Sequence, residues 1–174
     1  MKPTVHLREV ETDDLELFFE HQRDPVAVAM VAFQSRDRAA FDQHWAKLLA
    51  DATSLKKTIV VASAVSADSP AQDQVAGHIG SWTSEGKREI GYWLDRAYWG
   101  RGIATEALTA FLRLEQTRPL YASAANHNAA SLRVLQKCGF TITGSADEPS
   151  DGTGVARVFL TLTAAAPAAS VSVT

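Results

Sequence analysis

The sequence predicts a single domain of the α/β (α+β) class, in which helices flank a mixed sheet. Its 174 residues are enough for one domain with a core of its own. Short stretches rich in β-branched residues alternate along the chain with apolar stretches of helical periodicity. Because no internal repeat or second domain is visible, we expect one domain over residues 1–163 and a tail over residues 164–174.

Composition and charge argue against several classes of protein. Hydrophobic residues make up 46% of the chain and charged residues 21%, which is typical of a globular protein. The net charge of -3 argues against a nucleic-acid binder, which usually carries a basic face. No apolar run approaches the ~20 residues that span a membrane, and residues 1–14 lack the apolar core of a secretion signal. The single cysteine, Cys138, suits a reducing compartment, so we expect a cytoplasmic protein with no membrane or nucleic-acid partner.

The N-terminal part of the chain predicts one strand and then helices. Alternating apolar side chains indicate a strand over residues 5–10. The run Thr12-Asp13-Asp14 offers short oxygen-bearing side chains that can cap the first helix. Asp24-Pro25 ends that helix, because proline lacks an amide hydrogen and disfavours helical geometry in the residue before it. We expect a short helix and a loop over residues 26–33, and a longer helix over residues 39–50.

The middle of the chain predicts three strands. β-Branched residues indicate a strand over residues 58–65, followed by a polar loop over residues 66–73. Residues 74–83 and 88–94 are predicted to form two more strands, and the turn Ser84-Glu85-Gly86-Lys87 between them is typical of a hairpin.

The second half predicts helices and strands in alternation. The first of its helices follows a glycine-containing turn and ends before Pro119. We expect helices over residues 103–117 and 128–138, and strands over residues 120–124, 140–144 and 156–163. The tail over residues 164–174 has no periodic pattern, and its composition indicates disorder. If the tail were ordered, its apolar residues would favour a homodimer.

The turn over residues 99–105, WGRGIAT, is predicted to hold a pyrophosphate. Free amides at a helix start point outward, and the helix dipole adds partial positive charge there. Gly100 and Gly102 let the backbone approach an anion closely, and Arg101 adds charge. No Walker A string is present, and the dinucleotide fingerprint would need a glycine where Thr105 stands. Taken alone, the turn is equally compatible with a strand-to-helix connection that binds nothing.

A second motif follows, in which residues 126–131 read NHNAAS and residues 132–140 read LRVLQKCGF. Asn128 is suited to cap the helix start and Gly139 to end it in a left-handed conformation. Together with YWGRGIATEAL, this pattern resembles the Gcn5-related N-acetyltransferase (GNAT) superfamily, most of all its branch of ribosomal-protein N-terminal acetyltransferases. The resemblance covers residues 74–162 most closely. It implies that residues 1–163 form an N-acetyltransferase domain with a mostly antiparallel sheet that splays apart in the middle.

The resemblance also implies acetyl-CoA as cosubstrate and no metal ion. The glycine turn would hold the pyrophosphate, and the strand before it would pair with the pantetheine arm. Trp99 stands where Gln or Arg is usual in the family. The cofactor contacts that we expect are Tyr92, Trp93, Leu94, Gly100, Arg101, Gly102, Ile103, Ala104, Thr105, Asn126 and Asn128.

Two catalytic residues are expected. Ser131 matches the position that this branch uses to reprotonate the leaving CoA thiolate, and Leu135 stands where many relatives have a tyrosine acid. Glu89 resembles an acid often found at this place, which takes a proton from the amine directly or through water. A solvated strand-end glutamate is the alternative for Glu89. His78 either lines the substrate pocket or is a structural histidine in the core, and the other histidines lack the spacing of a zinc site.

The expected activity is N-acetyl transfer to a primary amine, made directly in a complex of enzyme, acetyl-CoA and acceptor. The acceptor is a protein N-terminus or a small amine, and the negative net charge favours a cationic one. The alternative is a catalytically silent acyl-CoA-binding or regulatory module.

Overall fold

A computed structural model describes residues 4–62, 73–147 and 154–164. The predicted single α/β domain is confirmed: a mixed, mostly antiparallel sheet has the strand order β1-β2-β3-β4-β5-β7-β6. The strands are β1 (Thr4–Arg8), β2 (Leu55–Ala62), β3 (Asp73–Ser84), β4 (Lys87–Leu94), β5 (Leu120–Ala125), β6 (Thr141–Ala146) and β7 (Arg157–Leu162). The helices are α1 (Asp14–His21), α2 (Pro25–Val31), α3 (Arg38–Ala50), α4 (Ile103–Leu114) and α5 (Ala129–Lys137), with the short 3-10 helix η1 (Arg96–Tyr98).

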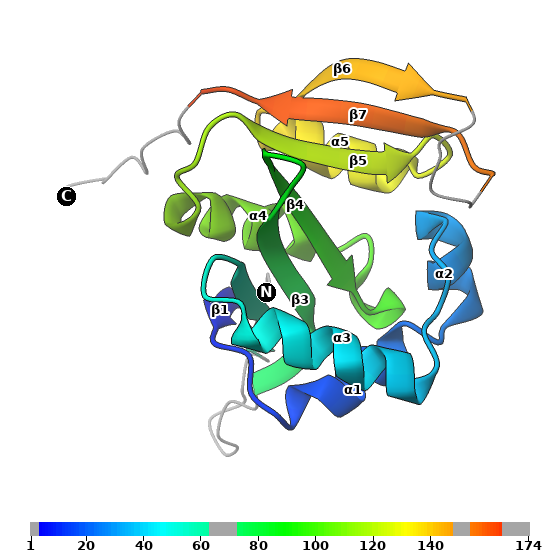
Figure 1. Ribbon diagram of the computed structural model, residues 1–174, viewed down its shortest axis with the longest axis vertical. Helices are drawn as coiled ribbons and strands as arrows, with labels where there is room; N and C mark the ends of the chain where they lie inside the picture. Colours follow the sequence, from blue (N-terminus) through cyan, green and yellow to red (C-terminus); the bar gives the residue numbers. More distant parts are fainter. Residues whose placement is uncertain (1–3, 63–72, 148–153, 165–174) are drawn as a thin grey trace.

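The sheet splays apart between β4 and β5, which are its one parallel pair among the described strands. These strands pair only at Arg88 with Leu120 and at Glu89 with Tyr121. Beyond these residues β4 turns away with β3, whereas β5 stays with β7 and β6 (Figure 1). The splayed sheet implied by the family resemblance is therefore present, and α2 lies at the wide end of the V-shaped opening between β4 and β5.

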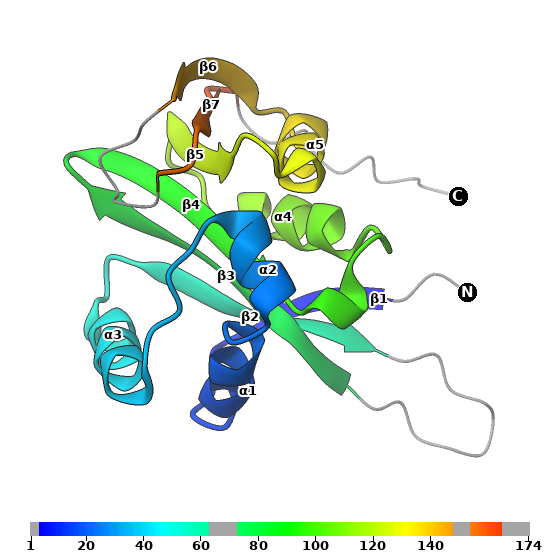
Figure 2. The same cartoon turned by 90° about the vertical axis from the view of Figure 1, so that its right-hand side faces the viewer.

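Helices cover both faces of the sheet (Figure 2). The main core lies on the face covered by α4, whose Ile103, Leu108 and Phe111 are buried with Ile59 and Ile79 of the sheet. A smaller aromatic cluster of Phe18, Phe41 and Trp45 lies on the other face, under α1 and α3. None of the helices in the described residues is long and apolar enough to cross a membrane.

The predicted hairpin between β3 and β4 is confirmed. Ser84 pairs with Lys87, and the two residues between them have positive φ angles, 49° at Glu85 and 74° at Gly86. Positive φ at both central positions is the mark of a type I′ turn, which matches the twist of the flanking strands. The Glu85-Gly86 turn thus fixes the register between β3 and β4, and β4 then leads into the opening.

Several element boundaries differ from the predictions. β2 begins at Leu55 instead of residue 58, because Lys56 and Lys57 turn their ammonium groups to carbonyl oxygens and to Glu9 while the backbone stays extended. The helix predicted over residues 103–117 ends at Leu114. The strand predicted at residues 63–65, the loop predicted over residues 66–72 and the tail over residues 165–174 lie outside the described residues.

Glu115 explains the early end of α4. Its backbone leaves the helical conformation, with φ -90° and ψ 99°, and its carboxylate turns into the interior. There it accepts hydrogen bonds from the hydroxyl of Ser81 and the guanidinium of Arg88. Burial alone would raise the pKa of Glu115, but these bonds and that of the Thr117 amide outweigh it and lower the pKa from 4.5 to about 2.

The free energy of unfolding should therefore depend on the ionisation of Glu115. Because the folded pKa lies below the unfolded one, the contribution is complete above pH 4.5 and is lost as the pH falls towards 2. We expect Glu115→Gln to lower the free energy of unfolding by about 2–3 kcal/mol at pH 7. Denaturant unfolding at a series of pH values would measure this gap, which should shrink in acid. A gap that is constant with pH would contradict the assignment to Glu115.

Candidate functional site

Two cavities meet inside the V-shaped opening. The large cavity, of about 680 Å³, lies between β4, β5 and α3, and the turn cavity, of about 350 Å³, lies between the glycine turn and α5. Both are lined by Val31, Tyr92, Trp93, Asn128 and Ser131. These five residues form the junction of the two cavities, so that molecules bound in each would meet there.

The glycine turn opens towards the turn cavity. Gly100 and Gly102 have φ angles of 72° and 78°, in the left-handed region that favours glycine. No heavy atom lies within 4 Å of the place where a Cβ would stand on either of them, beyond their chain neighbours. Gly102 is the N-cap of α4 and supplies no capping side chain, so the first amides of α4 are available to an anion.

The structure places most of the predicted cofactor contacts around the turn cavity. Those that line it are Tyr92, Trp93, Leu94, Gly100, Gly102, Ile103, Ala104, Thr105 and Asn128. Arg101 is exposed, with its guanidinium 5.7 Å from the centre of the Tyr98 ring. Asn126 is also exposed, and its amide donates to the carbonyl oxygen of Ala156. These two lie outside the lining of both cavities.

The predicted caps of α5 are confirmed. The side-chain oxygen of Asn128 accepts a hydrogen bond of 3.0 Å from the backbone amide of Ser131. At the other end Gly139 has a φ of 94°, and the amide of Phe140 donates to the carbonyl oxygen of Leu135 over 3.1 Å. The N-terminal cap leaves the hydroxyl of Ser131 free of the helix end, so that it can face the junction.

The hydroxyl of Ser131 lies 2.9 Å from that of Tyr92, and the two groups form a hydrogen bond. Tyr92 comes from β4 and Ser131 from the first turn of α5, so the bond bridges the two sides of the opening. Burial raises the pKa of Tyr92, which keeps its phenol protonated and able to donate. The family resemblance implies a backbone role for Tyr92, and no sequence signal connects its side chain to a serine 39 residues away.

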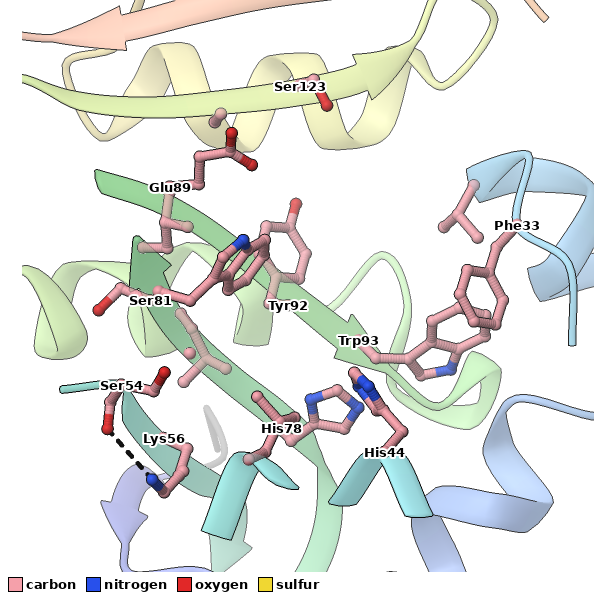
Figure 3. A pocket seen from close by; sticks show the side chains of 18 of the residues that line it. Phe33, His44, Ser54, Lys56, His78, Ser81, Glu89, Tyr92, Trp93 and Ser123 are labelled. Carbon is pink, nitrogen blue, oxygen red and sulfur yellow. Dashed lines mark hydrogen bonds between the residues drawn. The ribbon is translucent and has the colours of Figure 1, made fainter. Parts of the chain in front are cut away.

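Glu89 projects into the large cavity (Figure 3), where its carboxylate lies below Ser123 of β5. It stands at the last position where β4 still pairs with β5, opposite Tyr121, and faces Trp82 of β3. The structure thus places this side chain in the opening and not at a solvated strand end.

Aromatic side chains from α1, α3, β3, β4 and the segment after α2 form the wall of the large cavity. Phe33 and Trp93 meet edge to face with ring centres 5.5 Å apart. His78 lies against Phe18 and Trp45, at 4.8 and 5.0 Å between ring centres. Burial lowers the pKa of His78 to about 3, so at neutral pH its ring is uncharged and a weak proton acceptor. Trp45 is buried and also lines the large cavity.

The described residues contain no group of three or more His, Cys, Asp or Glu side chains that could hold a metal ion. What the arrangement offers is an anion site at a helix start, a pair of hydroxyls at the junction, and a carboxylate in an aromatic cavity.

Residues 4–141 match the model of a protein family described as the acetyltransferase (GNAT) domain. None of the curated proteins shows significant similarity to the chain. Solved structures are similar in fold. A GNAT-family acetyltransferase from Bacillus anthracis has a TM-score of 0.71 and 17% identity, over 91% of this chain and 94% of its own.

Two further similar structures contain CoA. Spermidine N-acetyltransferase from Vibrio cholerae, in complex with CoA and spermine, has a TM-score of 0.75 and 15% identity, over 91% of this chain and 95% of its own. A ribosomal L7/L12 alpha-N-protein acetyltransferase in complex with CoA has a TM-score of 0.71 and 18% identity, over 92% and 94%. At these low sequence identities the similarity shows that the fold is shared, and no more.

Proposed function

The chain belongs to the acetyltransferase (GNAT) family, and we propose that it transfers the acetyl group of acetyl-CoA directly to a primary amine within a ternary complex. The observation that carries this proposal is the junction, where the turn cavity and the large cavity meet at the hydrogen-bonded hydroxyls of Tyr92 and Ser131. One cavity would hold the cofactor and the other the acceptor, with the thioester between them.

The turn cavity has the features that CoA needs. The pyrophosphate would bind the first amides of α4, where the open space at Gly100 and Gly102 lets phosphate oxygens approach the backbone. The pantetheine arm would lie along residues 91–94 of β4, whose edge no longer pairs with β5. Backbone groups on that edge need hydrogen-bond partners, and the amides of the arm supply them. Two of the similar solved structures hold CoA, which supports the same ligand here.

The chemistry requires two proton transfers at opposite sides of the thioester. The amine must lose a proton before its nitrogen can attack the carbonyl carbon, and Glu89 would accept that proton directly or through a water molecule. When the carbon–sulfur bond breaks, the sulfur takes a proton from the hydroxyl of Ser131. The hydroxyl of Tyr92 would hold Ser131 in position and pass it a proton, which the phenol regains from solvent once CoA leaves.

Gly102→Val should weaken acetyl-CoA binding at least tenfold. Valine strongly disfavours the φ of 78°, and its side chain would fill the space where the pyrophosphate is expected. Isothermal titration calorimetry with acetyl-CoA measures the effect. Gly86→Val is a useful control, since Gly86 also has a positive φ, of 74°, and an open Cβ position but lies in the distant hairpin turn. Equal loss of affinity in both variants would argue against the turn as the binding site.

The activity itself is tested by calorimetry and by the release of free CoA thiol in the presence of a broad panel of amines. Binding of acetyl-CoA with amine-dependent thiol release is expected. Binding without release for any amine would indicate the silent acyl-CoA-binding module instead, and the absence of acetyl-CoA binding would refute both.

A further inference from the structure

The charged side chains of the large cavity indicate which class of acceptor it can bind. Among the described residues, the charged side chains that line it are Arg36, Lys56, Arg157, Asp51 and Glu89. Most of these are engaged within the protein. The Asp51 carboxylate accepts from Thr53 and Ser54, the Lys56 ammonium donates to two backbone carbonyls, and Arg157 donates to the carbonyl oxygen of Ala32. Arg36 and Glu89 remain as the charges that a ligand could use.

Arg36 is held firmly at the cavity wall. Gln22 is buried, and its amide bonds to Arg36 twice, with its nitrogen 3.0 Å from the Arg36 carbonyl oxygen and its oxygen 3.4 Å from the Arg36 amide. Ser35 also donates to the carbonyl oxygen of Gln22, over 2.6 Å. The guanidinium then lies over the ring of Phe33, 5.0 Å from its centre. The hydrogen bonds thus fix the backbone of Arg36 at the cavity wall, and its half-buried side chain packs on Phe33.

The guanidinium of Arg36 has no carboxylate or other hydrogen-bond partner among the described residues. Burial lowers the pKa of Arg36, whereas the hydrogen bonds that Arg8 and Arg38 donate to carboxylates raise the pKa of those two residues. Arg36 also helps to lower the pKa of His44, after the effect of burial, so two basic groups face each other at this side of the cavity. A half-buried cation without a partner loses hydration without compensation, and a bound anion would restore the balance.

The rings connect this cation to the junction. Trp93 lines the junction, its ring meets that of Phe33 at 5.5 Å, and Arg36 stacks on Phe33 at 5.0 Å. The rings of Phe33 and Trp93 therefore form an apolar surface between an anion bound at Arg36 and the junction. We propose that the acceptor is a small amino carboxylate in which an aromatic or apolar spacer separates the primary amine from the carboxylate.

This inference rests on the proposed function and names the acceptor class. The carboxylate would pair with Arg36, the spacer would lie against Phe33 and Trp93, and the amine would reach the junction near Ser131. A polyamine would bring its second ammonium group towards Arg36 and be repelled. The local charges thus favour a different acceptor from the cationic one that the net charge of the whole chain suggests.

A matched series of acceptors tests the proposal: 4-(aminomethyl)benzoate, its neutral carboxamide, and 1,4-bis(aminomethyl)benzene. They share the amine and the ring and differ in the charge of the distal group. We expect kcat/KM to be about tenfold to a hundredfold higher for the carboxylate than for the carboxamide, mainly through KM. 5-Aminopentanoate and its amide repeat the comparison with a flexible spacer.

Variants of Arg36 test whether this residue causes the preference for carboxylate acceptors. Arg36→Gln should raise KM for the carboxylates about tenfold or more and leave the carboxamide unchanged, and Arg36→Glu should shift the preference to the diamine. Arg38→Gln is the matched control, because Arg38 pairs with Glu16 and Asp42 on the surface outside the cavity. Acetyl-CoA affinity should be unchanged in all three variants, since neither Arg36 nor Arg38 lines the turn cavity.

The outcomes separate this proposal from the proposed function. Failure to bind acetyl-CoA would refute the function. The acceptor class would be overturned if kcat/KM showed no preference for the carboxylates. It would also be overturned if kcat/KM were higher for a diamine, or for a peptide with an amidated C-terminus, than for the carboxylates. If no amine is acetylated, calorimetric titration of 4-(aminomethyl)benzoate into the CoA complex still tests the carboxylate site at Arg36. Binding that Arg36→Gln abolishes would support this site, and absence of binding would overturn it.

Discussion

Ser131→Ala is expected to lower kcat about a hundredfold and to leave acetyl-CoA affinity within about twofold. A positioned general acid contributes roughly 10²–10⁴ in rate, and the lower end applies here because a thiolate leaves readily, its thiol having a pKa of ~8.5. The helix should be unaffected, because Asn128 caps the backbone amide of Ser131 and not its side chain. Single-turnover measurement of thiol release, under conditions where chemistry limits the rate, gives the relevant constant.

A double-mutant cycle extends this prediction to Tyr92. If Tyr92 acts by holding and reprotonating Ser131, Tyr92→Phe should lower kcat, and the double variant should be little slower than Ser131→Ala alone. Ser123→Ala is the control, because Ser123 lines the large cavity on the opposite strand and has no role in the proposed transfer. Additive losses would show that the two hydroxyls act separately, and an unchanged rate in Ser131→Ala would refute the acid role.

The parts of the site that the sequence predicted are those determined over short stretches of chain. The glycine turn before α4, the cap at Asn128 and the helix end at Gly139 each depend on a few adjacent residues. Residue type alone therefore points to them. The two motifs also resemble a family, which supplied the splayed sheet that no local pattern encodes.

The parts that the sequence did not predict depend on contacts between distant segments. Tyr92 meets Ser131 only because β4 and α5 converge at the junction, and Arg36 stands out only once its lack of a carboxylate partner is known. Buried charges were missed for the same reason. Asp14 does lie at the start of a helix, as predicted, but the sequence does not show that it is buried. Glu115 is predicted inside a helix that ends before it.

Asp14→Ala is expected to lower the free energy of unfolding by about 3–5 kcal/mol. The side chain of Asp14 is 4% exposed, and it bonds Arg8 through both carboxylate oxygens at 2.6 and 2.7 Å. It also accepts from the hydroxyl of Thr58, at 2.6 Å, and from the amide of Glu11, at 2.9 Å. One carboxylate therefore joins β1, β2 and the start of α1. Its removal leaves the buried hydroxyl of Thr58 and the partly buried guanidinium of Arg8 without this acceptor, which costs more than the loss of an exposed ion pair.

Thermal unfolding should show the loss as a fall in Tm of about 10 °C, on the scale of 2–4 °C per kcal/mol for a domain of this size. Asp13→Ala is the matched control, since the neighbouring Asp13 is exposed and makes no capping bond. Burial would raise the pKa of Asp14, but the bonds from Arg8, Thr58 and Glu11 lower it below its usual 3.8. The stabilisation is therefore present above pH 3.8 and fades in stronger acid, where the variant and the wild type should converge. A loss below 1 kcal/mol at pH 7 would mean that the pair behaves as an exposed one, and that β1 is held to α1 by apolar packing instead.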